Sequence, residues 1–436
     1  MTRKQVLILS MGVMGVALIV GVVLFVSHRT DHALSRDTRD RDQASVTATD
    51  SEIAVPQPLP THVSFKDPAR DAVVQLLVQD GHIAIGSTIP RTGEQGLGGQ
   101  ALSDGIFVAF NKANTSDGGL FGGTSVSLDQ RDDSGDLTRA QPHIFDVLTK
   151  TQLFFCPTGD TVFEKLYVPL LQRGKIAVIF PAVGTRHAIT KDMPVAWYRP
   201  SYAQEVAALV AYAVEVLKQT KIAVFYEDSE WGIEARDAAA HALKKKAGCD
   251  LCLSASYQPG TVLIQSAVTA IRRVEPEVII AIASGRPTYN FIREAINQQL
   301  NYVSFLGISR TASIAEQLKI SRGIPLITAS VVPNPQKSSL PIAKEYRTFM
   351  QQYLPNKGLT PDSLEGYIAA TLFVYFAQQA GKEAVVKDLF GAVEKVEDML
   401  FKGLVLRYKD QALSHTIWIN TGAGQDWLAY EGKVLT

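Results

Sequence analysis

The sequence is short of cysteine and has no excess of either charge, and each shortage excludes a class of protein. Three cysteines in 436 residues are too few for a disulfide-stapled scaffold. The 43 basic and 43 acidic residues cancel, and no basic stripe carries interleaved aromatic side chains, so nothing in the composition favours nucleic-acid binding. A hydrophobic content of 46% still lets a chain of this length bury two cores of ordinary size.

Motifs of catalysis, cofactor binding and metal binding are also missing. The sequence contains no H-E-x-x-H, no G-x-S-x-G and no P-loop. Cys249 and Cys252 form a C-x-x-C, but no second pair completes a zinc site, so incidental placement is favoured over a redox or disulfide role. The acidic residues that follow Leu128 are more typical of a solvated loop than of a metal site. We therefore expect no catalytic residues, no cofactor and no metal, and an enzyme is the least favoured alternative.

The amino terminus has the pattern of a membrane anchor followed by a tether. Basic residues precede an uncharged apolar run from Val6 to Ser27, and about 20 such residues cross a bilayer as a helix. No convincing cleavage site follows, which favours an uncleaved anchor over a signal peptide. We expect residues 1–4 in the cytoplasm, a transmembrane helix over 5–27 and a flexible linker over 28–64. Residues 65–82 form a lead-in with a short helix from Pro68 to Val78.

A single β-α-β unit organises the rest of the chain. Phe154 to Cys156 is an apolar strand, Val162 to Arg173 has helical spacing, and Lys175 to Phe180 is a second buried strand. Such a unit builds a parallel sheet and places the loops after both strands at one edge, where ligands bind in open α/β sheets. Thr161 and Glu164 also fit a capping box, so a structural cap and a ligand contact are equally plausible for this loop.

Strands and helices alternate on both sides of this unit, which indicates an α/β fold with two parallel-sheet lobes. The first series includes a helix from Gly99 to Ala113, with Ile106, Phe107 and Phe110 facing the core. The second series starts after residue 202, and its strands are expected at residues 221–226, 254–257, 278–283 and 304–307, followed by 326–332, 404–408 and 416–420. Gly93 to Gly99 lie too far from the preceding strand for a dinucleotide fingerprint, so a loop around another small ligand is favoured.

The order of these segments resembles the type 1 periplasmic binding proteins, particularly the leucine/isoleucine/valine-binding-like receptors of ABC transporters. The resemblance extends from about Ile83 to Asn420 and is carried by IAIGSTIPRTGEQGLGG, CPTGDTVFEKLYVPLL, FPAVGT, WYRPSYAQEV, KIAVFYEDSEWG, VIIAIASGRPTYNFI and LEGYIAA. It implies two lobes joined by three crossovers that close on a small ligand. The first lobe would comprise residues 83–198 and 331–404, and the second lobe residues 199–330 and 405–436.

The resemblance also implies which residues contact the ligand. The contacts in the first lobe would be Leu97, Thr158, Gly159, Thr161, Val183, Gly184 and Thr185, and Asp160 in the same loop is a further candidate. The contacts in the second lobe would be Tyr202, Trp231, Ser284, Gly285, Ser309 and Arg310. A loop aromatic packed on its own lobe is an equally good interpretation of Trp231.

Two charges depart from the pattern of the amino-acid binders in this family. Those proteins hold the ligand's carboxylate with first-lobe hydroxyls and amides, and its ammonium with a second-lobe acid. Here Ile308-Ser309-Arg310 replaces the acid, while Asp160 lies in the carboxylate loop. The charge polarity of the site is therefore altered.

The leading hypothesis is a membrane-tethered extracytoplasmic protein that delivers a small polar ligand, such as an amino acid or a derivative, to an ABC importer. Its partners would be the transporter's membrane subunits and the inner membrane. The alternative is a sensory ligand-binding subunit that signals through a membrane partner.

Overall fold

The computed structural model describes residues 72–422, 427–430 and 434–435, which belong to one compact unit. The expected anchor (5–27), the linker (28–64) and the first part of the lead-in lie outside these residues. In the part of the chain that is described, no helix is both long and apolar enough to cross a bilayer.

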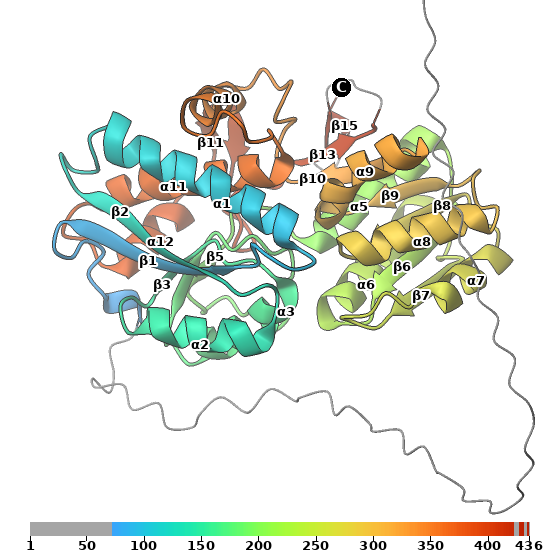
Figure 1. The fold of residues 1–436 in the computed structure, drawn as a ribbon, viewed down its shortest axis with the longest axis horizontal. Helices are drawn as coiled ribbons and strands as arrows, with labels where there is room; N and C mark the ends of the chain where they lie inside the picture. The colour runs from blue at the N-terminus through green and yellow to red at the C-terminus, as the bar shows by residue number, and fades with distance from the viewer. Residues whose placement is uncertain (1–71, 423–426, 431–433, 436) are drawn as a thin grey trace, which may run out of the picture. The chain divides into compact units, whose positions relative to one another are not determined.

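The first sheet has five parallel strands in the order β2-β1-β3-β4-β5 (Figure 1). Its strands are β1 (His82–Ile89), β2 (Ser125–Asp132), β3 (Leu153–Phe155), β4 (Ala177–Ile179) and β5 (Val195–Ala196). Its helices are α1 (Gly96–Asn111), α2 (Leu137–Leu148), α3 (Asp160–Val162), α4 (Val168–Gln172), α10 (Pro341–Tyr353), α11 (Pro361–Ala380) and α12 (Val386–Glu394). A π-helical turn, Phe163–Tyr167, joins α3 to α4, and a hairpin of β11 (Met399–Phe401) and β12 (Leu404–Leu406) completes this lobe.

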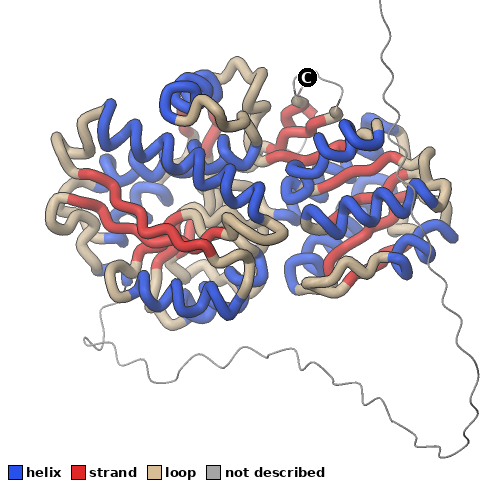
Figure 2. The backbone as a smooth tube through the Cα atoms, in the orientation of Figure 1, coloured by secondary structure: helices blue, strands red, loops and turns tan. Residues whose placement is uncertain are grey.

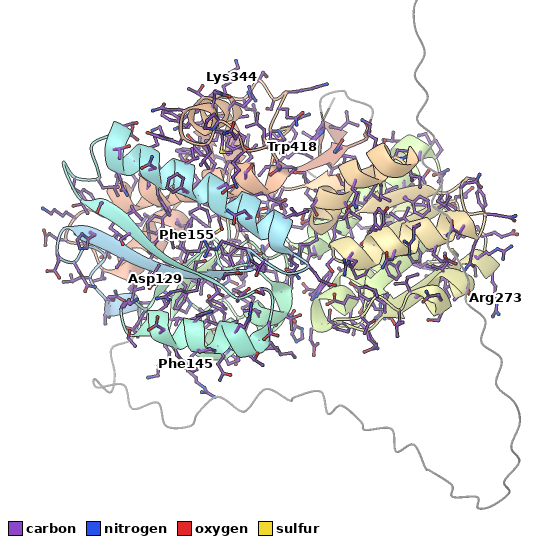
Figure 3. The ribbon with its side chains drawn as sticks, in the orientation of Figure 1. Asp129, Phe145, Phe155, Arg273, Lys344 and Trp418 are labelled. Carbon is purple, nitrogen blue, oxygen red and sulfur yellow. The ribbon has the colours of Figure 1, made fainter. Side chains whose placement is uncertain are left out.

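Helices cover both faces of the first sheet, which explains the uninterrupted apolar runs of its inner strands. Neighbouring residues of β3 divide between two cores. Phe155 packs on Phe110 of α1 and Phe373 of α11, at ring-centroid distances of 5.2 and 5.4 Å. Phe154 packs on Tyr167 on the opposite face. Figure 3 shows the Phe155 side chain inside the lobe, whereas Lys344 lies at its periphery.

The second sheet is mixed and has the order β7-β6-β8-β9-β10-β13-β14-β15. Its parallel strands are β6 (Ile222–Glu227), β7 (Leu253–Tyr257), β8 (Val278–Ile282), β9 (Ser304–Gly307) and β10 (Leu326–Ser330). Its antiparallel strands are β13 (Ile417–Asn420), β14 (Leu428–Tyr430) and β15 (Val434–Leu435). The helices α5 (Tyr202–Tyr212) and α6 (Glu230–Ala247) pack on one face, and α7 (Gln265–Arg273), α8 (Gly285–Asn297) and α9 (Ala312–Arg322) on the other (Figure 2).

The chain passes between the two sheets after β5, after β10 and after β12. We call the first sheet with its helices the first lobe, and the second sheet with its helices the second lobe. Parallel strands in both lobes agree with the expected α/β architecture.

Several predictions of local structure were wrong. A helix was expected over 68–78, but in the described part of this segment Ala72–Val74 forms a single 3-10 turn. The helix does not continue, because the backbones of Leu76 and Leu77 pair with the loop before α12. Phe107 is 52% exposed, since it lies about 100° around the helix from buried Ile106. The helix α9 was missed, although Ile314 and Leu318, four residues apart, are both buried.

Glycines allow a close contact between α1 and α11 in the first lobe. A Cβ on Gly105 would lie 1.8 Å from the carbonyl oxygen of Ser363, and a Cβ on Gly366 would lie 2.2 Å from that of Leu102. The two helix backbones therefore touch, and these contacts leave no space for a methyl group.

Gly105→Ala is expected to lower the free energy of unfolding by about 1–3 kcal/mol, because the added methyl forces the two helices apart. Gly391→Ala is the matched control, since a Cβ at this α12 position meets nothing within 4 Å. The control should stabilise the protein by about 0.5–1 kcal/mol through helix propensity. Thermal unfolding of both variants checks this, and equal melting temperatures would contradict the close packing of α1 on α11.

Candidate functional site

A cavity of about 710 Å³ lies at the carboxyl ends of strands from both lobes. Thr158 and Ala182 follow β3 and β4 of the first lobe, and Ser284 and Ser309 follow β8 and β9 of the second lobe. Open parallel sheets bind ligands at this edge, and volumes of about 300–1,000 Å³ are typical of small-molecule pockets. The geometry of the cavity is therefore that of a small-ligand site.

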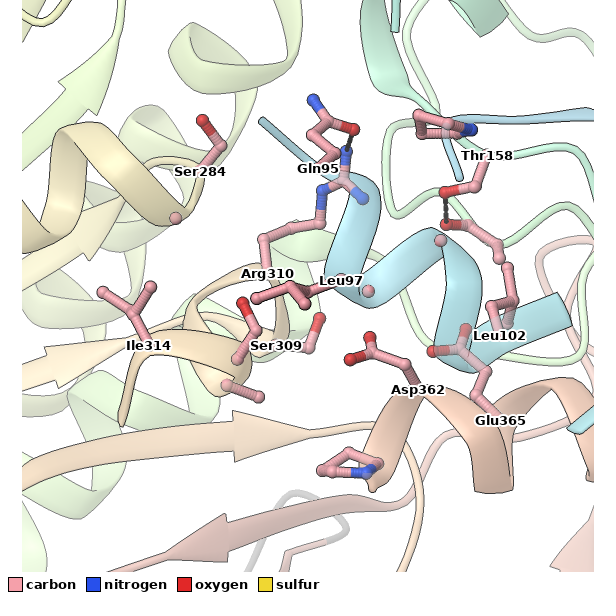
Figure 4. A pocket seen from close by; sticks show the side chains of 18 of the residues that line it. Gln95, Leu97, Leu102, Thr158, Ser284, Ser309, Arg310, Ile314, Asp362 and Glu365 are labelled. Atoms are coloured by element: carbon pink, nitrogen blue, oxygen red, sulfur yellow. Dashed lines mark hydrogen bonds between the residues drawn. The ribbon is translucent and has the colours of Figure 1, made fainter. Parts of the chain in front are cut away.

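The loop between β1 and α1 forms one wall of the cavity. Pro90, Gly98 and Leu102 line it, and Leu97, which is 82% exposed, reaches in from the first turn of α1 (Figure 4). Gly99 is required by packing, since a Cβ there would lie 1.9 Å from the carbonyl oxygen of Pro90. This wall is mostly apolar.

The loops after β3 and β4 form the neighbouring wall. The Thr158 hydroxyl donates to the carbonyl oxygen of Ala182 at 3.0 Å, which ties the two loops together. The predicted capping box is absent. Gly159, with a φ of 100°, takes the cap position of α3 without a side-chain hydrogen bond. Glu164 instead accepts a hydrogen bond of 2.8 Å from the hydroxyl of Thr185, and burial raises the pKa of Glu164 to about 7.

An ion pair joins the two lobes beside the cavity, between the buried side chain of Asp160 and the largely buried side chain of Arg310. A guanidinium nitrogen of Arg310, in the second lobe, lies 2.8 Å from a carboxylate oxygen of Asp160, in the first lobe. The same nitrogen donates to Gln95 Oε1 at 3.0 Å, and the Tyr202 hydroxyl donates to Asp160 at 3.0 Å. Burial alone would lower the pKa of Arg310, but the carboxylate of Asp160 raises it. Arg310 is therefore charged at all ordinary pH values.

Arg199, in the first crossover, makes a second connection between the lobes. Its guanidinium lies 2.6 Å from Glu205 of α5 and 3.3 Å from Glu365 of α11. It also donates to the hydroxyl of Ser309 at 2.8 Å. Arg199 and Glu205 are 3% and 0% exposed in their side chains, so this network is shielded from solvent.

Two carboxylates face the cavity from the first two turns of α11. Asp362 and Glu365 are three residues apart and so lie on one face of the helix. Figure 4 shows Asp362 pointing toward Ser309 and Leu97, with Glu365 beside it. Burial, together with the neighbouring Glu365, raises the pKa of Asp362 to about 7, although Arg310 and Arg199 act in the opposite direction. Burial also raises the pKa of Glu365.

The structure separates the sequence-predicted ligand residues into three groups. Six of them line the cavity: Leu97, Thr158, Ser284, Gly285, Ser309 and Arg310. Two do not line the cavity but support Arg310: Asp160 forms the ion pair with Arg310, and the Tyr202 hydroxyl donates a hydrogen bond to Asp160. The others are not part of the cavity lining: Gly159, Thr161, Val183, Gly184, Thr185 and Trp231.

Two residues of the third group support the wall instead. A Cβ on Gly184 would lie 2.3 Å from the Tyr202 ring, so glycine lets that ring reach Asp160. Trp231 packs on Tyr202 with ring centroids 5.4 Å apart and donates to Glu227 at 3.0 Å, both within its own lobe.

Sequence reasoning missed Arg199, Asp362 and Glu365. Arg199 and Glu365 were in segments that carried the family resemblance, yet neither was assigned to the site. Glu365 had a detectable signal, since it is the one charged residue between Leu364 and Ala380. The position of Asp362 depends on how α11 packs on α1, which local sequence does not reveal.

In the part of the chain that is described, no group of three or more His, Cys, Asp or Glu side chains is arranged to hold a metal ion. Cys156, Cys249 and Cys252 are free thiols.

A family model described as "Periplasmic binding protein" matches residues 82–424. A search of curated proteins found no match.

Solved structures of similar fold cover most of the chain. A substrate-binding periplasmic protein from Ralstonia solanacearum is 23% identical, with a TM-score of 0.68, over 78% of this chain and 97% of that one. A possible leucine/isoleucine/valine-binding protein from Rhodopirellula baltica SH 1 is 22% identical, with a TM-score of 0.70, over 83% and 98%. A solute-binding protein of an ABC transporter from R. palustris, in complex with benzoate, is 15% identical, with a TM-score of 0.67, over 81% and 97%. At these identities the likeness is one of fold.

Asp160→Asn is expected to lower the free energy of unfolding by on the order of 3 kcal/mol, because it leaves the buried guanidinium of Arg310 without its carboxylate. The double variant Asp160→Asn with Arg310→Met should lose less than the two single variants together, since neither charge is then unpaired. Asp237→Asn is the control: its partner Arg236 lies 2.6 Å away on the exposed surface, and the loss should stay below about 1 kcal/mol. Additive losses in the double variant would contradict a coupled pair.

Asp362→Asn is expected to stabilise the protein at pH 8 by about 1 kcal/mol or more. The folded pKa of about 7 exceeds the ordinary 3.8, so this group makes the free energy of unfolding fall as the pH rises from about 4 to about 7. Asparagine is uncharged and removes that loss, so the stabilisation should vanish at pH 4. Melting temperatures of the variant, the wild type and Asp80→Asn, an exposed control, test this. A lower melting temperature at pH 8 would show that the charged carboxylate stabilises α11.

Proposed function

Because the chain belongs to the periplasmic binding protein family, we propose that it captures a small polar solute by lobe closure and delivers it to an ABC importer. Members of this family bind solutes without transforming them, so the chain is not an enzyme.

The cavity between the lobes is the observation that carries the proposal. Its wall combines apolar side chains such as Leu97 and Ile314 with polar groups such as Thr158, Asn290 and Ser309. Because both lobes contribute, a solute bound there contacts both at once and favours the closed arrangement over an open one. Its volume suits a molecule of the size of an amino acid or a derivative.

The relatives support the class of function and leave the ligand open. One similar structure is described as a possible leucine/isoleucine/valine-binding protein, and another was solved with benzoate. Amino-acid transport is therefore one candidate for this chain among several.

The tether and the lobe boundaries belong to the same proposal. The apolar run of residues 5–27 would anchor the protein in the inner membrane, with the binding lobes in the periplasm or outside the cell. The lobes would comprise residues 83–198 with 331–404, and residues 199–330 with 405–436, except that the first lobe extends past residue 404, because β12 ends at Leu406 and Leu406 packs in the first-lobe core. An anchor would keep the solute-loaded protein close to its membrane partner.

A solute that occupies the cavity should raise the melting temperature of the full-length protein. At 100 times its Kd the stabilisation is about 2.7 kcal/mol. Gly98→Leu should abolish this effect, because its side chain projects into the cavity from α1. Gly391→Leu is the matched control, since Gly391 lines a separate groove beside α12. A screen of amino acids, amides, polyamines and small carboxylates provides the probes, and equal responses of both variants would exclude this cavity.

Deletion of the gene should abolish uptake of the solute that emerges from this screen. The reason is that an importer of this type receives its substrate from the binding protein. Transport of the labelled solute into the deletion strain, with and without the restored gene, measures the effect. Unchanged uptake with a lost transcriptional or motility response would instead support the sensory alternative.

A further inference from the structure

The charges around the cavity are not balanced. Among its lining residues and their direct ion-pair partners there are five carboxylates and three guanidiniums. The carboxylates are Glu94, Asp160, Glu205, Asp362 and Glu365, and the guanidiniums are Arg199, Arg286 and Arg310. With all of them ionised, the surroundings of the cavity carry two negative charges in excess.

The guanidiniums are already engaged. Arg310 is paired with Asp160 at 2.8 Å, and Arg199 is paired with Glu205 at 2.6 Å. Arg286, at the rim, lies 3.7 Å from Glu94. Each guanidinium is thus at least partly neutralised by a carboxylate of the protein, which weakens its attraction for an anionic ligand.

The carboxylates on α11 are less well compensated. Asp362 takes part in no ion pair with the residues that the structure describes. Glu365 is 7% exposed, and its Oε1 faces Arg199 at 3.3 Å, whereas none of the described residues donates a hydrogen bond to its Oε2. Among the described residues, Asp362 is half-buried and has no ion pair, and Glu365 is buried with one oxygen unbonded. Withdrawing carboxylate oxygens from water disfavours the charged form, which agrees with the raised pKa of both groups.

Local space is kept open next to these carboxylates. Gly98 of α1 faces α11, and even a Cβ at this position would already lie 3.6 Å from Asp362 Oδ2. The apolar side chains of Leu97 and Ile314 line the adjoining cavity (Figure 4). The arrangement offers carboxylate oxygens at one end and an apolar surface beside them.

We infer that the solute carries a protonated amine or amidinium, which binds between Asp362 and Glu365, and has no free carboxylate. This assignment rests on the proposed function as a solute-binding protein. The cation supplies the positive partner that Asp362 lacks and the hydrogen-bond donor that Glu365 Oε2 lacks, and an apolar or hydroxyl-bearing body of the solute contacts Leu97 and the serines of the second lobe. Simple amines, amidines and the amides of amino acids meet this description.

A different role for Asp362 predicts different behaviour. A carboxylate in the first turn of a helix also complements the helix dipole, with a typical stabilisation of about 0.3–1 kcal/mol. If this were its whole role, Asp362→Asn would lower stability and leave solute binding unchanged.

Three probe series with matched carbon skeletons test the inference on the full-length protein. The amines are 3-methylbutylamine, 2-phenylethylamine and 1,4-diaminobutane. The alcohols are 3-methylbutanol, 2-phenylethanol and 1,4-butanediol, and the carboxylates are 4-methylpentanoate, 3-phenylpropanoate and adipate. Thermal shift and titration calorimetry should place the tightest binder among the amines, with its alcohol at least tenfold weaker and its carboxylate without effect.

Variants then locate the cation. Asp362→Asn should weaken amine binding at least tenfold, and Glu365→Gln should weaken it as well. Asp237→Asn is the matched control, because Asp237 is 62% exposed on α6 and does not line the cavity, and it should change the affinity less than twofold. Equal affinity of the wild type and Asp362→Asn for an amine would overturn the inference.

The outcomes also separate this inference from the proposed function. Binding of alcohols or carboxylates in preference to amines would overturn the cation assignment and uphold solute capture. Binding of none of these probes, and of no solute in the wider screen, would overturn both.

Discussion

The two lobes are connected through buried guanidiniums, and the character of the site depends on these contacts. Arg310 reaches from the second lobe to Asp160 of the first, and Arg199 lies between Glu205 and Glu365, one from each lobe. Separating a buried guanidinium from its carboxylate is costly, so these pairs hold the lobes at the distance that shapes the cavity. They also engage the guanidiniums of Arg199 and Arg310, which leaves Asp362 of α11 without an ion pair among the described residues.

The sequence predicts the architecture well because apolar runs and turn residues are local signals. The β3-α-β4 unit, the alternation of strands and helices, and the placement of Thr158 and Ser309 at strand ends follow from such signals and from the family resemblance. The capping box failed because Glu164 has a partner, Thr185, that lies 21 residues further along the chain. Asp362 and Glu365 were missed for a related reason: their place at the cavity depends on the contact of α11 with α1.

The altered polarity that the sequence suggested has a structural explanation. Asp160 lies in the loop where amino-acid binders of this kind would hold the ligand's carboxylate. It forms an ion pair with Arg310, which stands where those proteins would carry an acid. The protein's own side chains thus form an ion pair where an α-amino acid would otherwise supply both charges. The solute is left with the rest of the cavity, where the groups on α11 are acidic and the β1–α1 wall is apolar.

A structure of the protein saturated with its stabilising solute tests the account most directly. The account predicts the solute in the cavity between the two sheets, in contact with residues of both lobes, with its positive group within hydrogen-bond distance of Asp362 or Glu365. A solute bound outside this cavity, or in contact with one lobe alone, would contradict it.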